Sequence, residues 1–454
     1  MSRRNKGSIA PLIIMLAVVG GSLFIYFSSM FERNAPVISM ETNGYWNLKK
    51  PLSLTISDDS GVKSYKIIMK TDKEEKILEY EKLAIPQNLI KLEVKPPRST
   101  HSIKDENIEI IVEANDISKW NMFNGNNTRE AFKLIVDKRK PNLNIVANSY
   151  KISRGGSALV IFKAEDSNLD KLYIEGNNGK KFMPQTFYKD GYYISLLAWP
   201  VVDKNFKATI IATDKAGNIS RSYVPLYLKQ KKYRVSKIKL SDKFLKGKIA
   251  ELAEEFVETE GVEDSLEQFK IINEDVRAKN EDLIHNLTPK VPSEKIDNFK
   301  MNRMYPLKNA QVVAHFGDHR KYYYNGQKVS EAYHLGLDLA SNAMAAIRPQ
   351  NSGKVIFADD NGLYGNMLAI SYGLGLYSIF GHCSSIKVNV GDTTQKREVV
   401  ANTGKSGYAM GDHLHFGVLV QGIEVRPQEW MDRQWIKLNI TNVIKSAKRI
   451  IDRN

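Results

Sequence analysis

The chain has 454 residues, 42% of them hydrophobic, and a formal net charge of +15. This length suggests about three domains, and the single cysteine, Cys383, excludes an intrachain disulfide. The basic residues are spread along the chain without a nucleic-acid-binding motif, so we expect no nucleic-acid partner. Such a charge suits a solvated surface, or attraction to an anionic polymer or membrane face.

The N-terminus is predicted to be a membrane anchor. Arg3, Arg4 and Lys6 precede an uncharged run from Ser8 to Ser29. As a helix, this run is long enough for about 30 Å of hydrocarbon, and the basic residues before it should stay in the cytoplasm. No small-residue cleavage site follows. We therefore expect residues 1–33 to be a cytoplasmic stub and an uncleaved signal anchor. A cleaved signal peptide is the alternative and leads to the same compartment.

Residues 34–230 read as β structure that is repeated once. Short alternating apolar runs are separated by turn signals, and several segments recur after about one hundred residues, the size of an immunoglobulin-like domain. We predict two immunoglobulin-like β-sandwiches, at 34–138 and 139–231, which act as spacers or binding modules. Four aspartates at turns are candidate calcium ligands, but turn capping is their commoner role. They are Asp58, Asp59, Asp166 and Asp214.

Residues 232–300 change to a helical pattern. Leu245, Ile249 and Leu252 recur at helical spacing, Gly261 interrupts the pattern, and a second apolar series runs from Leu266 towards Pro289. This predicts an antiparallel helical hairpin that serves as a spacer. The alternative is regulatory, with a side chain of this segment occupying a downstream metal site. The chemically capable residues are Glu258, Glu260, Glu281 and His285.

Two short motifs downstream carry metal-binding chemistry. The first, 333–338, places His334 and Asp338 four residues apart, and the second, 413–416, places His413 and His415 at alternate positions. Alternate residues of a strand point to the same face, so both of these histidines can face one site. Two imidazoles and a carboxylate are a common ligand set for a catalytic zinc that keeps one position open for water. Either motif alone is weak, but both occur in one glycine-rich region of about a hundred residues.

At these residues, the region 305–432 resembles the lysostaphin/LytM-type zinc endopeptidases, which cut peptide bonds in peptidoglycan. The shared motifs are Phe316-Gly317, Gly353-Lys354-Val355, Tyr364-Gly365-Asn366, Gly381-His382, Gly391-Asp392, Thr403-Gly404 and the run from Gly411 to Phe416. The resemblance implies that His334, Asp338 and His415 bind Zn²⁺. It also implies that His413 and His382 are catalytic, as general base or as stabiliser of the oxyanion.

Other residues of this β-rich peptidase domain, placed at 301–434, receive simpler interpretations. Strands are expected at 354–358, 367–370, 376–380 and 414–420. Cys383 is interpreted as a packed side chain, and His315 and His319 as non-ligands. Residues 321–324 form either a groove wall or an exposed loop. The tail at 435–454 is predicted to be an amphipathic basic helix, which docks on the domain or, alternatively, touches a membrane.

The chain is therefore expected to be mainly β and multidomain. The predicted function is a membrane-anchored zinc metalloendopeptidase that hydrolyses peptidoglycan cross-links in cell-wall remodelling. Its bulk would lie in the periplasm, beside the inner membrane, with other cell-wall enzymes as possible partners. By family analogy the bond is D-Ala–diaminopimelate, with pentaglycine bridges second. One alternative is a catalytically silent LytM-type protein that activates another wall hydrolase, and another is a scaffold built on the immunoglobulin-like domains.

Overall fold

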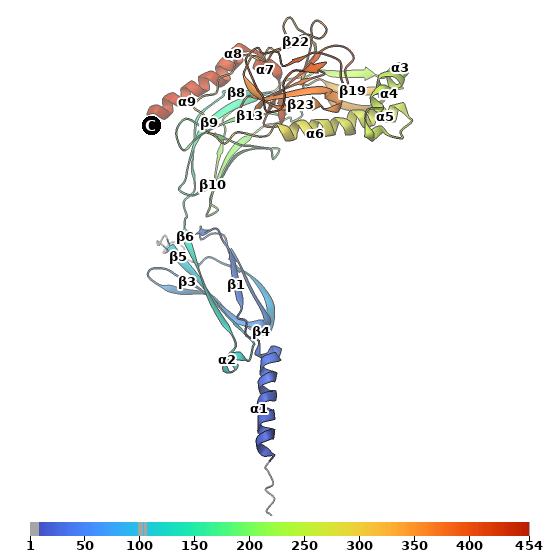
Figure 1. Cartoon of the computed structure of the whole chain (residues 1–454). Coiled ribbons are helices and arrows are strands. Elements are labelled where there is room, and N and C mark those ends of the chain that lie inside the picture. The colour runs from blue at the N-terminus through green and yellow to red at the C-terminus, as the bar shows by residue number, and fades with distance from the viewer. Residues whose placement is uncertain (1–8, 99–102, 104–106, 454) are drawn as a thin grey trace, which may run out of the picture. The chain divides into compact units, whose positions relative to one another are not determined.

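The computed structural model describes residues 9–98, 103 and 107–453, and it is mostly β (Figure 1). The chain forms two compact units. The first contains the residues up to Lys140 together with Thr213–Ile219, and the second contains Pro141–Ala212 together with Ser220–Asn454. The basic residues predicted to flank the membrane anchor, Arg3, Arg4 and Lys6, lie outside the described residues.

An apolar helix, α1 (Ala10–Phe27), begins the described chain. It has a proline in its first turn, where the missing N–H costs nothing, and none of its residues is buried. The 18 residues are long and apolar enough to cross a membrane, a property that signal sequences share. A short 3₁₀ turn, η1 (Ser29–Phe31), follows, and the Ser28 side chain accepts a hydrogen bond from its Met30 N–H.

The first unit is built on one six-stranded sheet with the order β1-β3-β5-β6-β2, in which β4 also pairs with β3. In β5, alternate residues from Ile108 to Ala114 are buried. This is the pattern of a strand with one face on the core, because successive side chains point to opposite faces. The elements are β1 (Val37–Glu41), β2 (Tyr45–Trp46), β3 (Leu52–Lys70), β4 (Glu75–Val94), β5 (Asn107–Asp116), α2 (Trp120–Phe123) and β6 (Asn127–Val136).

Three of the turn aspartates, Asp58, Asp166 and Asp214, cap backbone N–H groups, as expected. Asp58 Oδ1 accepts hydrogen bonds from the N–H of Ser60 at 2.9 Å and of Gly61 at 2.8 Å. Asp58 also lies in one group with Glu32 and Asp116, whose oxygens are close enough to hold a cation. Asp116 Oδ1 already accepts two backbone N–H groups, so it is a turn cap as well.

The second unit begins with two four-stranded sheets, β11-β10-β14-β15 and β12-β13-β9-β7, and a parallel pair, β16-β8. Phe162, Ile174, Ile194 and Ile210 of these sheets contribute to one core. The strands are β7 (Asn142–Asn148), β8 (Lys151–Ser153), β9 (Ser157–Glu165), β10 (Leu169–Gly176), β11 (Lys181–Phe182), β12 (Gln185–Thr186), β13 (Tyr192–Ala198), β14 (Ala208–Asp214), β15 (Ile219–Tyr223) and β16 (Tyr227–Lys229). The immunoglobulin-like assignment of either repeat stays a prediction.

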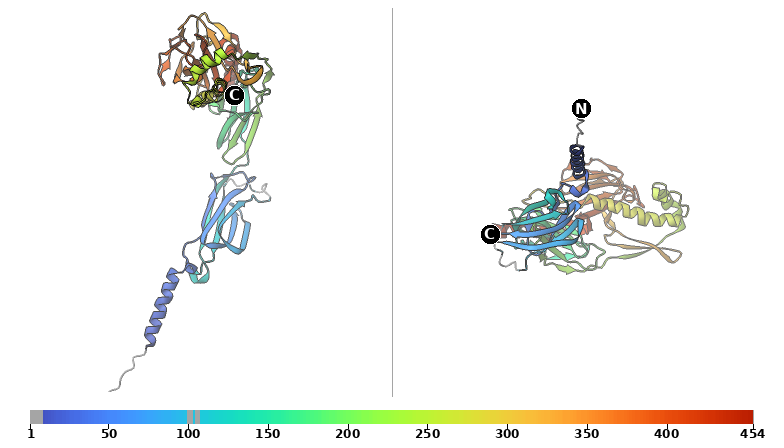
Figure 2. Two further views of the ribbon diagram at one scale, coloured as in Figure 1. Left: turned by 90° about the vertical axis from the view of Figure 1, so that its right-hand side faces the viewer. Right: turned by 90° about the horizontal axis from the view of Figure 1, so that it is seen from below.

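A strand and two helical stretches come next. The side chains of Ser241 and Asp264 cap the two stretches. The apolar residues in them, Phe269 among these, pack against Tyr322 and Leu363 of the C-terminal part. Figures 1 and 2 show the helical segment beside the C-terminal part of the same unit. The antiparallel hairpin stays a prediction. The elements are β17 (Val235–Lys239), α3 (Asp242–Phe244), η2 (Leu245–Ile249), α4 (Ala250–Ala253), η3 (Val257–Thr259), α5 (Ser265–Ile271), η4 (Ile272–Val276) and α6 (Arg277–Leu287).

The C-terminal part is organised around an eight-stranded sheet with the order β18-β21-β29-β25-β24-β23-β27, in which β30 pairs with β29. The strands predicted at 354–358, 367–370, 376–380 and 414–420 are confirmed as β23, β24, β25 and β29. The strands are β18 (Gln311–Ala314), β19 (His319–Tyr324), β20 (Gln327–Tyr333), β21 (Leu337–Ala340), β22 (Ala346–Ile347), β23 (Gly353–Asp360), β24 (Asn366–Ser371), β25 (Leu376–Gly381), β26 (Ser385–Ile386), β27 (Thr393–Thr394), β28 (Ala401–Asn402), β29 (Leu414–Val420) and β30 (Ile423–Val425).

A short 3₁₀ turn, η5 (Gly362–Tyr364), lies between β23 and β24. Helical elements end the described chain: α7 (Pro427–Met431), α8 (Arg433–Ile436), η6 (Lys437–Thr441) and α9 (Asn442–Arg453). The predicted amphipathic tail is helical, and it docks on β7 and β9 through a buried apolar face. That face consists of Val443, Ile444, Ala447 and Ile451. These residues belong to the same hydrophobic core as Phe162 and Phe416, so the second unit is held together across its whole length in sequence.

Candidate metal centre and its groove

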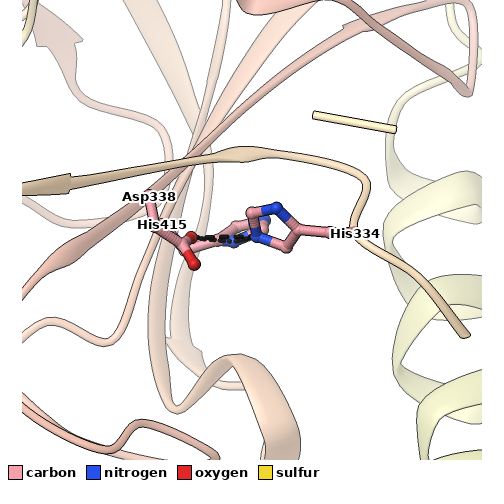
Figure 3. A group of neighbouring side chains, drawn as sticks. All are labelled: His334, Asp338 and His415. Carbon is pink, nitrogen blue, oxygen red and sulfur yellow. Dashed lines mark hydrogen bonds and ion pairs between the residues drawn. The ribbon is translucent and has the colours of Figure 1, made fainter. Parts of the chain in front are cut away.

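Two adjacent strands bring the predicted ligand residues together. Strand β21 pairs with β29, with Asp338 opposite His415, and His334 lies just after β20. Asp338 Oδ1 is 3.0 Å from His334 Nε2 and 2.9 Å from His415 Nδ1. The two ring nitrogens are 3.2 Å apart. Figure 3 shows the three side chains converging on one point.

The three donor atoms fit one face of a tetrahedral metal ion. With ligand bonds of about 2.0–2.1 Å, neighbouring ligands of a tetrahedral zinc are about 3.3 Å apart, close to the three observed spacings. His334 Nδ1 donates to the carbonyl oxygen of His315 at 2.9 Å, which leaves a lone pair on Nε2 for a cation. The outward atom of the His415 ring, Nε2, is buried without a hydrogen-bond partner among the described residues. The orientation of the His415 ring is therefore set by the contact of Nδ1 with Asp338.

Burial and hydrogen bonding set the charges in this centre. Burial alone would raise the pKa of Asp338, but the imidazoles of His334 and His415 beside it hold that pKa well below its ordinary value. Burial lowers the pKa of His415 and lowers the pKa of His382 to about 3. A carboxylate and neutral imidazoles are the protonation states that metal binding requires.

The two predicted catalytic histidines lie beside the ligand group. The ring centroids of His382 and His413 are 4.7 Å apart. Nδ1 of His382 donates to Ser406 O, and Nδ1 of His413 donates to Gly411 O, both at 2.8 Å. Because a carbonyl oxygen only accepts, each Nδ1 carries the hydrogen and each Nε2 is a proton acceptor. His413 Nε2 lies 3.8 Å from Asp338 Oδ2.

All five residues line one groove of about 810 Å³. The backbone of His382, directly after β25, is in the left-handed region with φ of 61°, a conformation that is costly for histidine and occurs at functional sites. Tyr322 of β19 also lines the groove. Residues 321–324 all lie in β19, so the exposed-loop alternative is wrong, and the groove-wall interpretation holds for Tyr322 of these four.

Several residues of the groove were not predicted from the sequence. Arg320 lies 4.0 Å from Asp338 Oδ2, and the buried ring of Tyr364 lies 5.2 Å from the His415 ring. Tyr364 belongs to the shared motif Tyr364-Gly365-Asn366, which could have indicated that it lies at the site. Five residues come from the region 232–300, and no local signal points to them: Ile238, Lys239, Leu240, Phe244 and Arg277.

The residues proposed to regulate the metal site do not reach it. None of Glu258, Glu260, Glu281 and His285 is among the residues lining the groove. Glu258 pairs with Lys279 at 2.7 Å, and His285 pairs with Glu424 at 2.8 Å. The alternative that one of these four side chains occupies the metal site is therefore wrong for this structure.

The remaining singled-out residues have structural roles. His319 stacks on Tyr333, with the ring centroids 4.4 Å apart, and His315 contributes its carbonyl oxygen to the bond with His334. Cys383 is fully buried, and burial raises the pKa of its thiol to about 12. It is a packed side chain, as expected.

Comparison with known proteins identifies this region. Residues 332–427 match the family model described as Peptidase family M23. The chain is 31% identical over 119 residues to the peptidoglycan DD-endopeptidase ShyB of Vibrio cholerae, covering 26% of this chain and 27% of the relative. It is 29% identical over 110 residues to the murein hydrolase activator EnvC of Escherichia coli, covering 24% and 26%.

Among solved structures, a putative peptidase M23 from Pseudomonas aeruginosa is 19% identical, with 62% of this chain and 95% of that chain covered and a TM-score of 0.39. The match to the two curated relatives spans about a quarter of their length. The matched residues 332–427 include His334, Asp338, His382, His413 and His415. The C-terminal part of this chain therefore carries a peptidase family M23 domain, as the resemblance to lysostaphin/LytM-type endopeptidases predicted.

Proposed function

We propose that this protein is a membrane-anchored zinc endopeptidase that hydrolyses peptide cross-links of peptidoglycan. The observation that carries the proposal is the convergence of His334 Nε2, Asp338 Oδ1 and His415 Nδ1 beside two further imidazoles in one groove. The three donors are Zn²⁺ ligands in this proposal, and the two histidines with free Nε2 atoms perform the proton transfers.

The residues divide the chemistry between them. Zinc supplies Lewis acidity when bound, which polarises a carbonyl and acidifies water near neutral pH. Nε2 of His413 or His382 accepts a proton from the attacking water and returns it to the leaving amine nitrogen. The hydrogen bonds from Nδ1 to backbone carbonyls keep both rings in the accepting tautomer and aimed at the groove.

The proposal extends to location and substrate. Helix α1 is the inner-membrane anchor, with the remainder of the chain in the periplasm. The cross-link is the D-Ala–diaminopimelate bond, for which the DD-endopeptidase relative is the support. Pentaglycine bridges are the second choice.

The direct test is a muropeptide analysis with the full chain in detergent. Zinc-loaded protein is incubated with purified sacculi, and the products are separated by chromatography and mass. We expect loss of cross-linked dimers and a matching gain of monomers. His334→Ala should lose both zinc and activity, whereas His413→Ala should keep zinc and lose at least about 100-fold in rate. His319→Ala, which is outside the groove, is the matched control.

The alternative is a catalytically silent M23 protein that activates another wall hydrolase, the role in the name of the EnvC relative. The complete set of five groove residues favours the enzyme. If the purified protein holds no zinc and the His334 and His413 variants behave as wild type, the endopeptidase proposal is wrong and the activator becomes the better explanation.

A further inference from the structure

One arginine of the groove comes from the helical region upstream of the peptidase domain. Arg277 is the first residue of α6 and directly follows the π-helical turn η4. Its Nε–H donates to Asn273 O at 3.2 Å, and its Nη2 donates to Asn273 Oδ1 at 3.0 Å. Asn273 is itself buried and donates to Ser330 Oγ at 2.8 Å. The guanidinium is therefore held in place by neutral groups while it lines the groove.

The two arginines of the groove differ in their counter-ions. Arg320 has Asp318 at 3.8 Å and Asp338 at 4.0 Å. For Arg277, in contrast, no carboxylate of the described residues lies within 4.0 Å of its guanidinium nitrogens. Glu281, about one turn later on the same helix, is half-buried; this partial burial raises its pKa to about 7, although the charge of Arg277 opposes the rise. Near neutral pH, Glu281 therefore supplies only part of a negative charge.

The remaining N–H donors of Arg277 are available to a ligand in the groove. A guanidinium has five N–H donors, of which Asn273 occupies two. Its planar fork matches the two oxygens of a carboxylate. Leu240, Phe244 and Leu363 line the same groove, and apolar walls strengthen a charged hydrogen bond by excluding water.

We propose that Arg277 binds a free carboxylate of the substrate peptide, so that the groove selects cross-links with a carboxylate close to the bond that is cut. The inference rests on the proposed function for the identity of the substrate. It assigns the helical segment upstream of the M23 domain a part in substrate recognition, in addition to its role in packing.

The experiment uses two synthetic cross-linked peptides with a D-Ala–diaminopimelate bond. They differ at one group: the carboxylate on the carbon that bears the scissile amide nitrogen is free in one and a carboxamide in the other. Affinities for the zinc-free full chain are measured by calorimetry, so the readout does not depend on activity. The variants are Arg277→Gln, Arg277→Lys and, as matched control, Lys279→Gln. Lys279 is on the same helix, 65% exposed and paired with Glu258.

Wild type should bind the carboxylate peptide roughly 10- to 100-fold more tightly than the carboxamide. Arg277→Gln should lower the affinity for the carboxylate peptide by that factor and leave the carboxamide affinity unchanged. Arg277→Lys, with a single point charge, should be intermediate, and it carries the test if Arg277→Gln does not fold. Lys279→Gln should match wild type. The proposal is overturned if wild type shows no preference, if neither peptide binds, or if the Arg277 variants keep the wild-type ratio.

The same peptides with zinc-loaded protein separate this inference from the proposed function. If the peptides are cleaved but the preference for the carboxylate peptide does not depend on Arg277, only the inference about Arg277 is refuted. A preference that depends on Arg277, without cleavage of either peptide, supports the inference and refutes the endopeptidase.

Discussion

Gly336 lies between two of the proposed ligands, and its missing side chain leaves room for the third. A Cβ atom at this position would overlap Nε2 and Cε1 of the His415 ring and lie 3.1 Å from its Cδ2. The ring has little room to retreat, because it is 6% exposed and has the His334 ring 5.1 Å away on one side and the Tyr364 ring 5.2 Å away on another. Gly336→Ala should therefore displace His415.

The size of the effect follows from the overlap. Restoring ordinary contact requires a shift of roughly 1 Å, and overpacking of this kind costs about 1–3 kcal/mol of unfolding free energy. A misplacement of about 1 Å in a catalytic group lowers activity about 100-fold, and a disturbed ligand orientation lowers metal affinity about 10- to 100-fold. The assays are zinc competition with a chelator, thermal unfolding of the zinc-free protein, and release of muropeptides from sacculi.

Gly247→Ala is the matched control for this substitution. Gly247 is in the helical turn η2, and an added Cβ would meet nothing within 4 Å. It should leave zinc affinity unchanged and stabilise the protein by up to about 1 kcal/mol. Wild-type zinc affinity and activity in Gly336→Ala would refute the described contact between residue 336 and the His415 ring.

Two further substitutions test the junction between β9 and α7. Trp430 is fully buried and donates to Ser157 Oγ at 3.0 Å, so Trp430→Ala should lower the unfolding free energy by about 3–5 kcal/mol; denaturant titration measures it, and a loss below 1 kcal/mol would contradict the packing. Burial raises the pKa of Glu429 to about 7 from an ordinary 4.5. Because the folded-state pKa is the higher one, its stabilising contribution is complete below pH 4.5 and is lost as the pH rises to about 7, a loss of roughly 3 kcal/mol. Glu429→Gln should remove that part of the pH dependence, and an unchanged difference in stability between pH 4.5 and 7 would show that Glu429 is not the cause.

The convergence of His334, Asp338 and His415 could be predicted from the sequence because the information for it is local. The alternation of His413 and His415 fixes a shared face on β29, and the register of β21 against β29 then places Asp338 opposite His415. The parallel pairing of β17 with β19 was not predictable, since nothing in the five residues of β17 identifies a partner some eighty residues later. Arg277 is brought to the groove by the packing of η4 against β20 and of α6 against η5, which no local pattern predicts.

The ability of a side chain to bind metal did not predict its position where tertiary contacts decide the orientation. His285 and Glu281 can both bind metal, but α6 turns His285 to Glu424 and buries Glu281 away from the groove lining. The residue of this helix that does line the groove is Arg277, one to two turns earlier. Periodicity gives the apolar face of a helix, but it does not say which polar neighbour borders the site.

The M23 domain depends on residues outside the predicted boundaries of 301–434, and truncation tests this dependence. Tyr322 and Leu363 pack against Phe269 in one core cluster, and Trp430 shares another with Phe162. Removing residues before 301 exposes both apolar faces to water, and each large side chain that is uncovered costs about 1.5–3 kcal/mol. Residues 141–454 should therefore unfold cooperatively, whereas 301–454 should aggregate or lack a cooperative transition in calorimetry. Equal melting temperatures for the two fragments would show that the upstream segments add no stability to the peptidase domain. In that case, activity of the short fragment would be a fair measure of the isolated site. If the short fragment fails to fold, its silence says nothing about inhibition by the upstream segments, and the groove can be studied only in the longer chain.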